Sequence, residues 1–486
     1  MRASPSPCAR APRRRRARAR TRPWALGPIA LWLALGAQPS ARAEEGVCPP
    51  FPPAQPPNPS ESFAGAGIVP GKHKLPRESA SSGRIIELSG SGAEASADDM
   101  EGEALLILPK RADGSIAMDF VLAEGASVAA SVWSPVLCAT LVRVVGPSAL
   151  SPAELVPSVP KGALVVPNHR YHGSAAHLRP APAATGQAVG PDPYVPLQYG
   201  LARTGVLEGR PRFAGAGVRV ALLDSAPDTT ARELLHVRIL PLEDGPPSEP
   251  AMHGSLVAGV ISAIENNAFG IAGIAPAADL LAIPVCTPVS DPLGEECRMF
   301  DLLRGIDRAW AEDARVVNLA LVGPPDPVLE RAMERLRQLG ILVVAAAGNE
   351  GTDRPRYPAA YPSVIGVGAL DERGRRWPRS NYGASVSLLA PGVEVLSTLP
   401  ADRFAFADGT SLAAAHVTGL LAVLLAGSDD PELVRSAMLD AAHRATAAPP
   451  GRRRAGAAPS QGAEAAVLPR LCDVLPALGQ SCPAKP

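Results

Sequence analysis

Residues 408–427, DGTSLAAAHVTGLLAVLLAG, constrain the fold of this chain more than any other stretch. The pattern predicts a turn followed at once by a helix with almost no polar face. Other elements must cover such a helix on every side, so we expect it to cross a domain core. Ser411 stands at the helix start, where unpaired N–H groups and the helix dipole favour a nucleophile beside a developing oxyanion. A simpler interpretation is that Thr410 or Ser411 only caps the helix.

Buried strands alternate with helices along the chain that precedes this stretch. The alternation predicts a mostly parallel sheet with helices on both faces, which is the α/β class. Less regular strands follow at 364–370, 387–392 and 393–398, and a surface helix at 431–445. The apolar strands of the regular part are 218–224, 279–286, 315–322 and 341–348, and its helices are 255–265, 300–312 and 326–340.

Polar residues at the strand ends and helix starts are the candidate site, because ligands gather outside the carboxyl ends of parallel strands. Asp224 ends a buried strand, where an unpaired carboxylate would be costly. His253 opens a helix, and Asn318 and Asn349 lie at the ends of apolar strands. Each has an ordinary interpretation as a turn or helix-end residue. Together with Ser411 they supply an orienting carboxylate, a base, an oxyanion donor and a nucleophile.

The order of these residues, and the motifs around them, resemble the subtilisin family of serine proteases from about residue 193 to 445. The motifs are LLDSAPD, HGSLVAG, AAAGNEG and GTSLAAAHVTG. The resemblance implies that Ser411 is the nucleophile, His253 the general base, Asp224 its orienter and Asn349 part of the oxyanion hole. It also implies a substrate-binding strand and first pocket formed by Ala320, Leu321, Val322, Gly323, Ala346 and Gly348.

Four positions depart from the family pattern. Ala226 and Val322 stand where glycines are usual, Ala320 stands where a serine is usual, and Ala415 stands where a proline is usual. A valine at 322 could narrow the pocket, so the alternative to a serine endopeptidase is a catalytically silent relative that binds peptides or partner proteins. An esterase of the other α/β type would need a GxSxG elbow, and Ser411 lies in GTSLA.

The chain before the catalytic region divides into segments of different composition. We expect a signal peptide at 1–43, a lead-in rich in Pro, Ser and Gly at 44–83, an α+β module at 84–178, a linker with a processing site at 179–196, a catalytic domain at 197–445 and a loop-like tail at 446–486. The module, with strands expected at 84–90, 104–109, 116–123, 136–146 and 163–172 and one helix at 151–159, resembles the family's ferredoxin-like inhibitory propeptide. That resemblance implies an intramolecular inhibitor released by autoprocessing.

An Arg-rich run, an apolar run from Trp24 to Ala37 and the sequence Ala41-Arg42-Ala43 indicate export, to the cell envelope, periplasm or exterior. The apolar run is short for a membrane span, so no stable span is expected after cleavage. Removal of Cys8 leaves an even number of cysteines, which indicates disulfides. Proximity favours Cys286–Cys297 and Cys472–Cys482, leaving Cys48 with Cys138, although other pairings remain open. A zinc site lacks suitably spaced ligands.

The formal net charge is zero, so no overall field attracts nucleic acid or an anionic membrane. We expect a monomer acting on protein or peptide substrates, with no nucleic-acid partner and no cofactor needed for the chemistry. ENNAFGIAG resembles the family's calcium loop, which implies Asn267 and Glu233 as ligands of a structural calcium ion. The same loop is equally consistent with a turn that holds no metal.

Overall fold

The computed structural model describes residues 98–110, 115–116, 118–173, 175–181, 191–209, 214–291, 293–447 and 465–482. The expected signal peptide, the lead-in and the strand expected at 84–90 lie outside these residues. No helix in the described ranges is long and apolar enough to cross a membrane.

The main sheet is parallel and has the order β18-β15-β14-β13-β11-β6-β8-β7. Its central strands are buried and apolar on both faces, as strands covered by helices on two sides must be. The α/β fold with helices on both faces is therefore confirmed. The strands are β6 (Arg219–Asp224), β7 (Arg238–Ile239), β8 (Asp279–Pro284), β11 (Val316–Leu319), β13 (Leu342–Ala346), β14 (Val364–Leu370), β15 (Leu388–Pro391) and β18 (Ala466–Val467).

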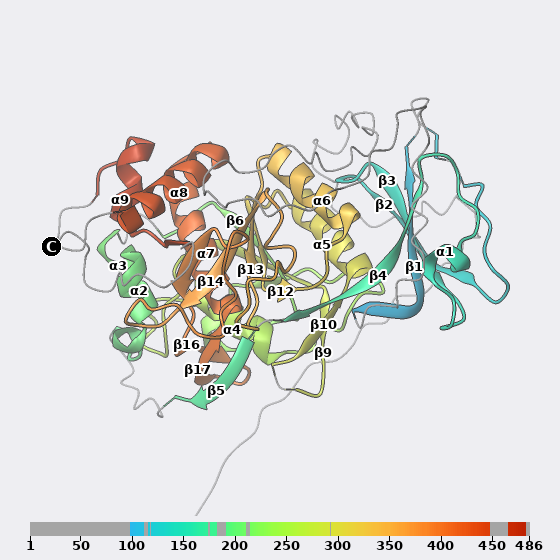
Figure 1. Ribbon diagram of the computed structural model, residues 1–486. Helices are drawn as coiled ribbons and strands as arrows, with labels where there is room; N and C mark the ends of the chain where they lie inside the picture. The colour runs from blue at the N-terminus through green and yellow to red at the C-terminus, as the bar shows by residue number, and fades with distance from the viewer. Residues whose placement is uncertain are drawn as a thin grey trace, which may run out of the picture. The chain divides into compact units, whose positions relative to one another are not determined.

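Two pairs of helices cover the two faces of this sheet (Figure 1). Helices α4 and α7 pack in one apolar cluster with α8, and α5 and α6 pack in a second cluster on the other face. In α6, Asp326 caps the helix through bonds from the N–H groups of Val328 and Leu329. The bounds are α4 (Met252–Ser262), α5 (Met299–Ala311), α6 (Pro327–Gln338), α7 (Thr410–Leu425) and α8 (Pro431–Ala447).

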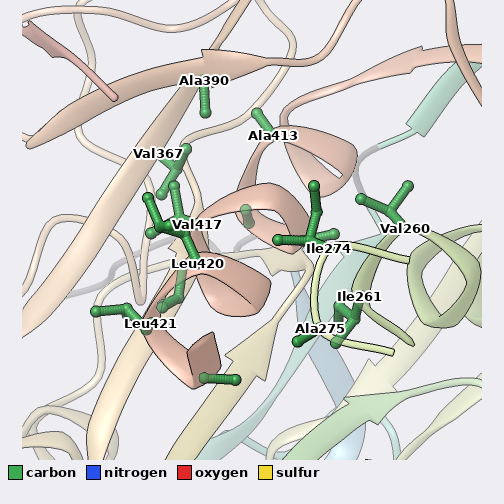
Figure 2. Packing of buried hydrophobic residues seen from close by; sticks show 14 of the residues in the cluster. Val260, Ile261, Ile274, Ala275, Val367, Ala390, Ala413, Val417, Leu420 and Leu421 are labelled. Atoms are coloured by element: carbon green, nitrogen blue, oxygen red, sulfur yellow. The ribbon is translucent and has the colours of Figure 1, made fainter. Parts of the chain in front are cut away.

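Helix α7 is buried along its whole length, as its sequence predicts. Val417, Leu420 and Leu421 pack toward Val367 of β14, and Ile274 lies between α7 and α4 (Figure 2). The helix thus forms the centre of the larger apolar cluster, and its first turn is held by a core that closes around it.

The amino-terminal module is an antiparallel sheet of order β2-β3-β1-β4 with the single short helix α1 after β3. This is the strand order of a ferredoxin-like fold. The strand expected at 116–123 is wrong: its described residues form only isolated bridges, and Met118 and Val121 are exposed. The edge strand falls instead on the alternating residues 127–134. The elements are β1 (Asp99–Pro109), β2 (Ser127–Ser134), β3 (Ala139–Val145), α1 (Pro152–Leu155) and β4 (Leu164–Gly173).

Smaller elements complete the described chain, and several of them lie where the sequence predicts no helix or strand. The tail at 466–478 is not loop-like, because β18 extends the main sheet and Leu471, Val474 and Leu475 are buried. The hairpin β9–β10 also had no periodic signal. The remaining elements are β5 (Ala175–Pro180), β9 (Cys286–Pro288), β10 (Glu295–Arg298), β12 (Leu321–Val322), β16 (Val395–Leu399), β17 (Arg403–Gly409), α2 (Tyr199–Thr204), α3 (Val206–Gly209) and α9 (Leu471–Val474).

Two of the expected disulfides are confirmed, Cys286–Cys297 between β9 and β10 and Cys472–Cys482 in the tail. Cys138 is also disulfide-bonded, and its expected partner Cys48 lies outside the described residues.

Candidate active site

Asp224, His253 and Ser411 come together at the carboxyl edge of the main sheet. Nδ1 of His253 lies 2.8 Å from Oδ1 of Asp224, and its Nε2 lies 3.1 Å from Oγ of Ser411. All three residues are nearly or fully buried. With the Nδ1–H donated to the carboxylate, Nε2 is the acceptor that can take the serine proton. This is the geometry of an activated nucleophile.

Each side chain is placed by the end of an element. Asp224 is the last residue of β6, and His253 and Ser411 are the second residues of α4 and α7. Helix α4 approaches β6 so closely that a Cβ on Gly254 would lie 2.1 Å from the carbonyl oxygen of Ser225. Only glycine fits there, and this close approach brings His253 beside Asp224.

Asn349 lies beside the start of α7. Its Oδ1 accepts bonds from the backbone N–H and the hydroxyl of Thr410, at 3.1 and 3.0 Å. These bonds turn the amide nitrogen away from Thr410. The Thr410 hydroxyl also accepts a bond from the Gly348 N–H at 3.0 Å. Thr410 therefore holds the loop after β13 in a fixed position relative to Ser411.

The residues expected to bind substrate lie in and beside β12 and at the end of β13. Oγ of Ser411 also lies 3.3 Å from the Ala320 carbonyl oxygen. Ala346 is buried at the end of β13, close in sequence to Gly348. Leu321 and Val322 form β12, which pairs with β4 of the amino-terminal module.

The end of β4 lies between two strands of the catalytic domain. His172 is opposite Val322 of β12 on one side and opposite Glu296 of β10 on the other. The Val322 side chain therefore does not prevent an extended chain from pairing at this edge. Tyr171, which is fully buried, packs on Gly323, where a Cβ would lie 2.3 Å from its ring.

The chain continues past Ser411 into β5. Ala175, the first residue of β5, is opposite Gly409, which directly precedes the first turn of α7. The segment from β4 to β5 is thus paired to the catalytic domain on both sides of the candidate nucleophile. Extended peptide held by backbone pairing on each side of a nucleophile is the arrangement that peptide-bond cleavage requires.

Glu295 is a site residue that the sequence does not predict. Its Oε2 lies 3.2 Å from Nδ1 of His253, so two carboxylates face one imidazole. Burial and the Glu295 charge raise the pKa of Asp224 to about 7. Burial lowers the pKa of His253, but the two carboxylates outweigh it and leave that pKa above its ordinary value. The only sequence signal for Glu295 was its position between Cys286 and Cys297, which were expected to be bonded.

The two residues expected to bind calcium are adjacent. Nδ2 of Asn267 donates to Oε2 of Glu233 at 3.2 Å, and the Ile271 N–H donates to the other carboxylate oxygen at 2.8 Å. Oδ1 of Asn267 accepts a bond from the Phe269 N–H. A calcium ion would therefore have to displace the Asn267 amide from the carboxylate, so this arrangement does not fit the ion without a side-chain rotation. Asn318, the remaining strand-end residue, instead bonds Thr418 inside the core.

Comparison with known proteins agrees with the Asp224–His253–Ser411 geometry. The model of the subtilase family matches residues 215–463. The chain belongs to the subtilase family. Over 222 residues it is 37% identical to subtilisin NAT of Bacillus subtilis subsp. natto, covering 44% of this chain and 56% of that protein. It is 36% identical to the subtilisin of Bacillus pumilus over 222 residues, covering 44% of this chain and 78% of that protein.

The fold likeness extends over more of the chain than the sequence match. Fervidolysin from Fervidobacterium pennivorans, described as a keratinolytic enzyme related to subtilisin, superposes with a TM-score of 0.60 at 22% identity. The superposition covers 81% of this subtilase and 63% of fervidolysin. The chain spans only 56% of the length of subtilisin NAT. The family assignment rests on residues 215–463.

Proposed function

We propose that this subtilase is a serine endopeptidase that hydrolyses peptide bonds through an acyl-enzyme on Ser411. The observation that supports this most strongly is the unbroken sequence of contacts from Asp224 through His253 to Ser411, at 2.8 and 3.1 Å. The subtilase relatives favour the same chemistry. The peptide pairing at β10 and β12 supports an extended protein or peptide substrate.

In the proposed reaction His253 takes the Ser411 proton on Nε2 as Oγ attacks the carbonyl carbon of the substrate. Asp224 holds the Nδ1–H and stabilises the imidazolium. The Asn349 amide and the Ser411 N–H stabilise the oxyanion. His253 then gives its proton to the leaving amine. In the second half, His253 takes a proton from water as the water attacks the acyl carbon, and returns it to Oγ of Ser411 when the ester bond breaks.

Turnover of an unfolded protein substrate tests this function. Ser411→Ala should lower kcat by about 10⁶-fold, because the nucleophile and its proton path are lost. Ser397→Ala is the matched control, since Ser397 is an equally buried serine that bonds the Leu256 carbonyl away from the site. Retention of turnover by Ser411→Ala would contradict the proposal.

We also propose that the chain is exported as a zymogen whose amino-terminal module inhibits the catalytic domain until Ser411 cuts the chain. The pairing of β4 and β5 on either side of Ser411 supports a cut in one of the two bonds that join Gly173 to Ala175. That position is earlier than the linker expected at 179–196. The disulfides Cys286–Cys297 and Cys472–Cys482 favour an oxidising compartment.

Amino-terminal sequencing of the purified product tests the zymogen proposal. The expected amino terminus is residue 174 or 175 in the wild type, and Ser411→Ala should keep the module attached. An equal cut in both proteins would show that another protease does the processing. A wild-type chain that stays intact, binds peptides and releases no product would favour the silent relative instead.

A further inference from the structure

A second buried carboxylate, that of Glu295, lies beside the Asp224–His253 pair. Glu295 is 3% exposed, and its Oε2 lies 3.2 Å from Nδ1 of His253. Its carboxylate also interacts with the side chains of Ser225 and Asp224. Burial opposes the ionised form, and His253 is the strongest of the groups that favour it and leave the pKa of Glu295 below its ordinary value. An ion pair with the imidazole is therefore its main stabilising interaction.

The hairpin β9–β10 holds this carboxylate in place. Cys297 of β10 is opposite Cys286 of β9, and the disulfide between them lies two residues from Glu295. The adjacent residue Glu296 lies on the other face of the strand, where it is partly exposed and pairs with Arg170 at 3.7 Å. The alternation of the strand thus directs one glutamate into the site and the next one away from it.

Strand β4 covers Glu295 from the substrate side. A Cβ on Gly173 would lie 3.2 Å from the Glu295 Oε2, so the covering residue brings no charge. The partner strand β9 brings Pro288 opposite Glu295, together with the disulfide. Of the titratable groups on the described elements, those that interact with Glu295 are Asp224 of β6 and His253 of α4.

We propose that Glu295 is a positioning residue that shares the Nδ1–H of His253 with Asp224 and stabilises the imidazolium formed when Ser411 gives up its proton. This inference rests on the proposed peptidase function. The Ser411 proton moves to Nε2, the original proton stays on Nδ1, and neither carboxylate takes it. Two negative charges, rather than one, then face the imidazolium. Because both favour the protonated ring, His253 is a stronger base than it would be beside Asp224 alone.

The pH dependence of kcat/KM tests the proposal on protein whose chain has been opened between β4 and β5, by itself or by an added protease. Its acid limb reports the ionisation of the base in the free enzyme. Glu295→Gln should move that limb to lower pH by about half a unit or more, because a charge near the imidazole is lost. Glu295→Asp keeps the charge at a greater distance from the imidazole. Its acid limb should lie at a pH between those of the wild type and Glu295→Gln. Glu296→Gln is the matched control and should leave the limb unchanged.

A second measurement separates positioning from packing. If Glu295 can hold the Nδ1–H, Asp224→Asn should lose about 10²-fold to 10³-fold in kcat, rather than the roughly 10⁴-fold typical of a triad without a second carboxylate. Adding Glu295→Gln should then bring the loss to about 10⁴-fold. Equal losses in the single and double variants would overturn the proposal.

Failures of the two claims are distinguishable. If Ser411 drives turnover but the limbs of wild type, Glu295→Gln and Glu296→Gln superimpose, the role of Glu295 is wrong and the peptidase function stands. If Ser411→Ala keeps the wild-type turnover, the proposed function itself is wrong. Thermal unfolding of each variant identifies misfolding. If Glu295→Gln does not fold, Glu295→Asp takes its place. An acid limb at lower pH than that of Glu296→Gln supports the proposal, and an acid limb at the same pH overturns it.

Discussion

At the scale of single residues, the site depends on a few side chains whose orientation is set by their neighbours. Thr410 is one example, since it fixes both Asn349 and Gly348 beside the start of α7. Asp224, His253, Asn349 and Ser411 were predictable from sequence because each follows a strongly periodic strand or begins a helix. Glu295 was not, since its proximity to His253 arises from pairing across a hairpin that has no periodicity.

Asn349→Ala should lower kcat by about 10²-fold to 10³-fold with a smaller effect on KM, because an oxyanion donor acts mainly in the transition state. Steady-state kinetics on a peptide substrate measure both constants. Asn318→Ala is the control, as this asparagine bonds Thr418 in the core and should affect stability rather than kcat. A loss that falls on KM alone would show that Asn349 does not act on the oxyanion.

At the scale of elements, helix α7 joins folding to function. Its sixteen residues are all buried, and its first turn carries Ser411. The sequence predicted this helix and the central strands because their apolar periods leave few alternatives. The strand at 127–134 and the tail strand β18 were missed for a physical reason, because each is an edge strand whose formation depends on a partner distant in sequence.

Leu421→Ala in α7 should lower the free energy of unfolding by about 2–5 kcal/mol, since it leaves a cavity in the core of Figure 2. Leu433→Ala in α8 is the matched control. Leu433 is 43% exposed, and its truncation should cost less than about 1 kcal/mol. Denaturant unfolding measures both. Equal losses would mean that the packing around α7 does not stabilise the domain.

At the scale of the whole molecule, ionisation of buried acids sets how stability depends on pH. Burial raises the pKa of Glu233 to about 8. A carboxyl whose folded pKa exceeds its unfolded value binds protons more tightly when folded, so its contribution is full below about pH 4.5 and is lost as pH rises toward 8. A bound calcium ion would oppose that loss, which makes the calcium expectation testable.

Glu233→Gln should raise the melting temperature relative to wild type at pH 8.5 in the presence of a chelator, and should change it little at pH 5. If calcium binds this loop, its addition at pH 8.5 should stabilise the wild type and leave the Gln variant unchanged. Asp429→Asn, an exposed acid that pairs with Arg315, is the control. A calcium response that survives Glu233→Gln would place the ion elsewhere.

The most direct test of the central claim is covalent labelling by a fluorophosphonate probe, read by mass spectrometry of the labelled peptide. The protein is examined after its chain has been opened between β4 and β5, by itself or by an added protease, so that the site is accessible. We expect one adduct, on Ser411, that is absent in Ser411→Ala and strongly slowed in His253→Ala. A folded, opened protein with no adduct on Ser411, or with the same adduct after His253→Ala, would contradict the account.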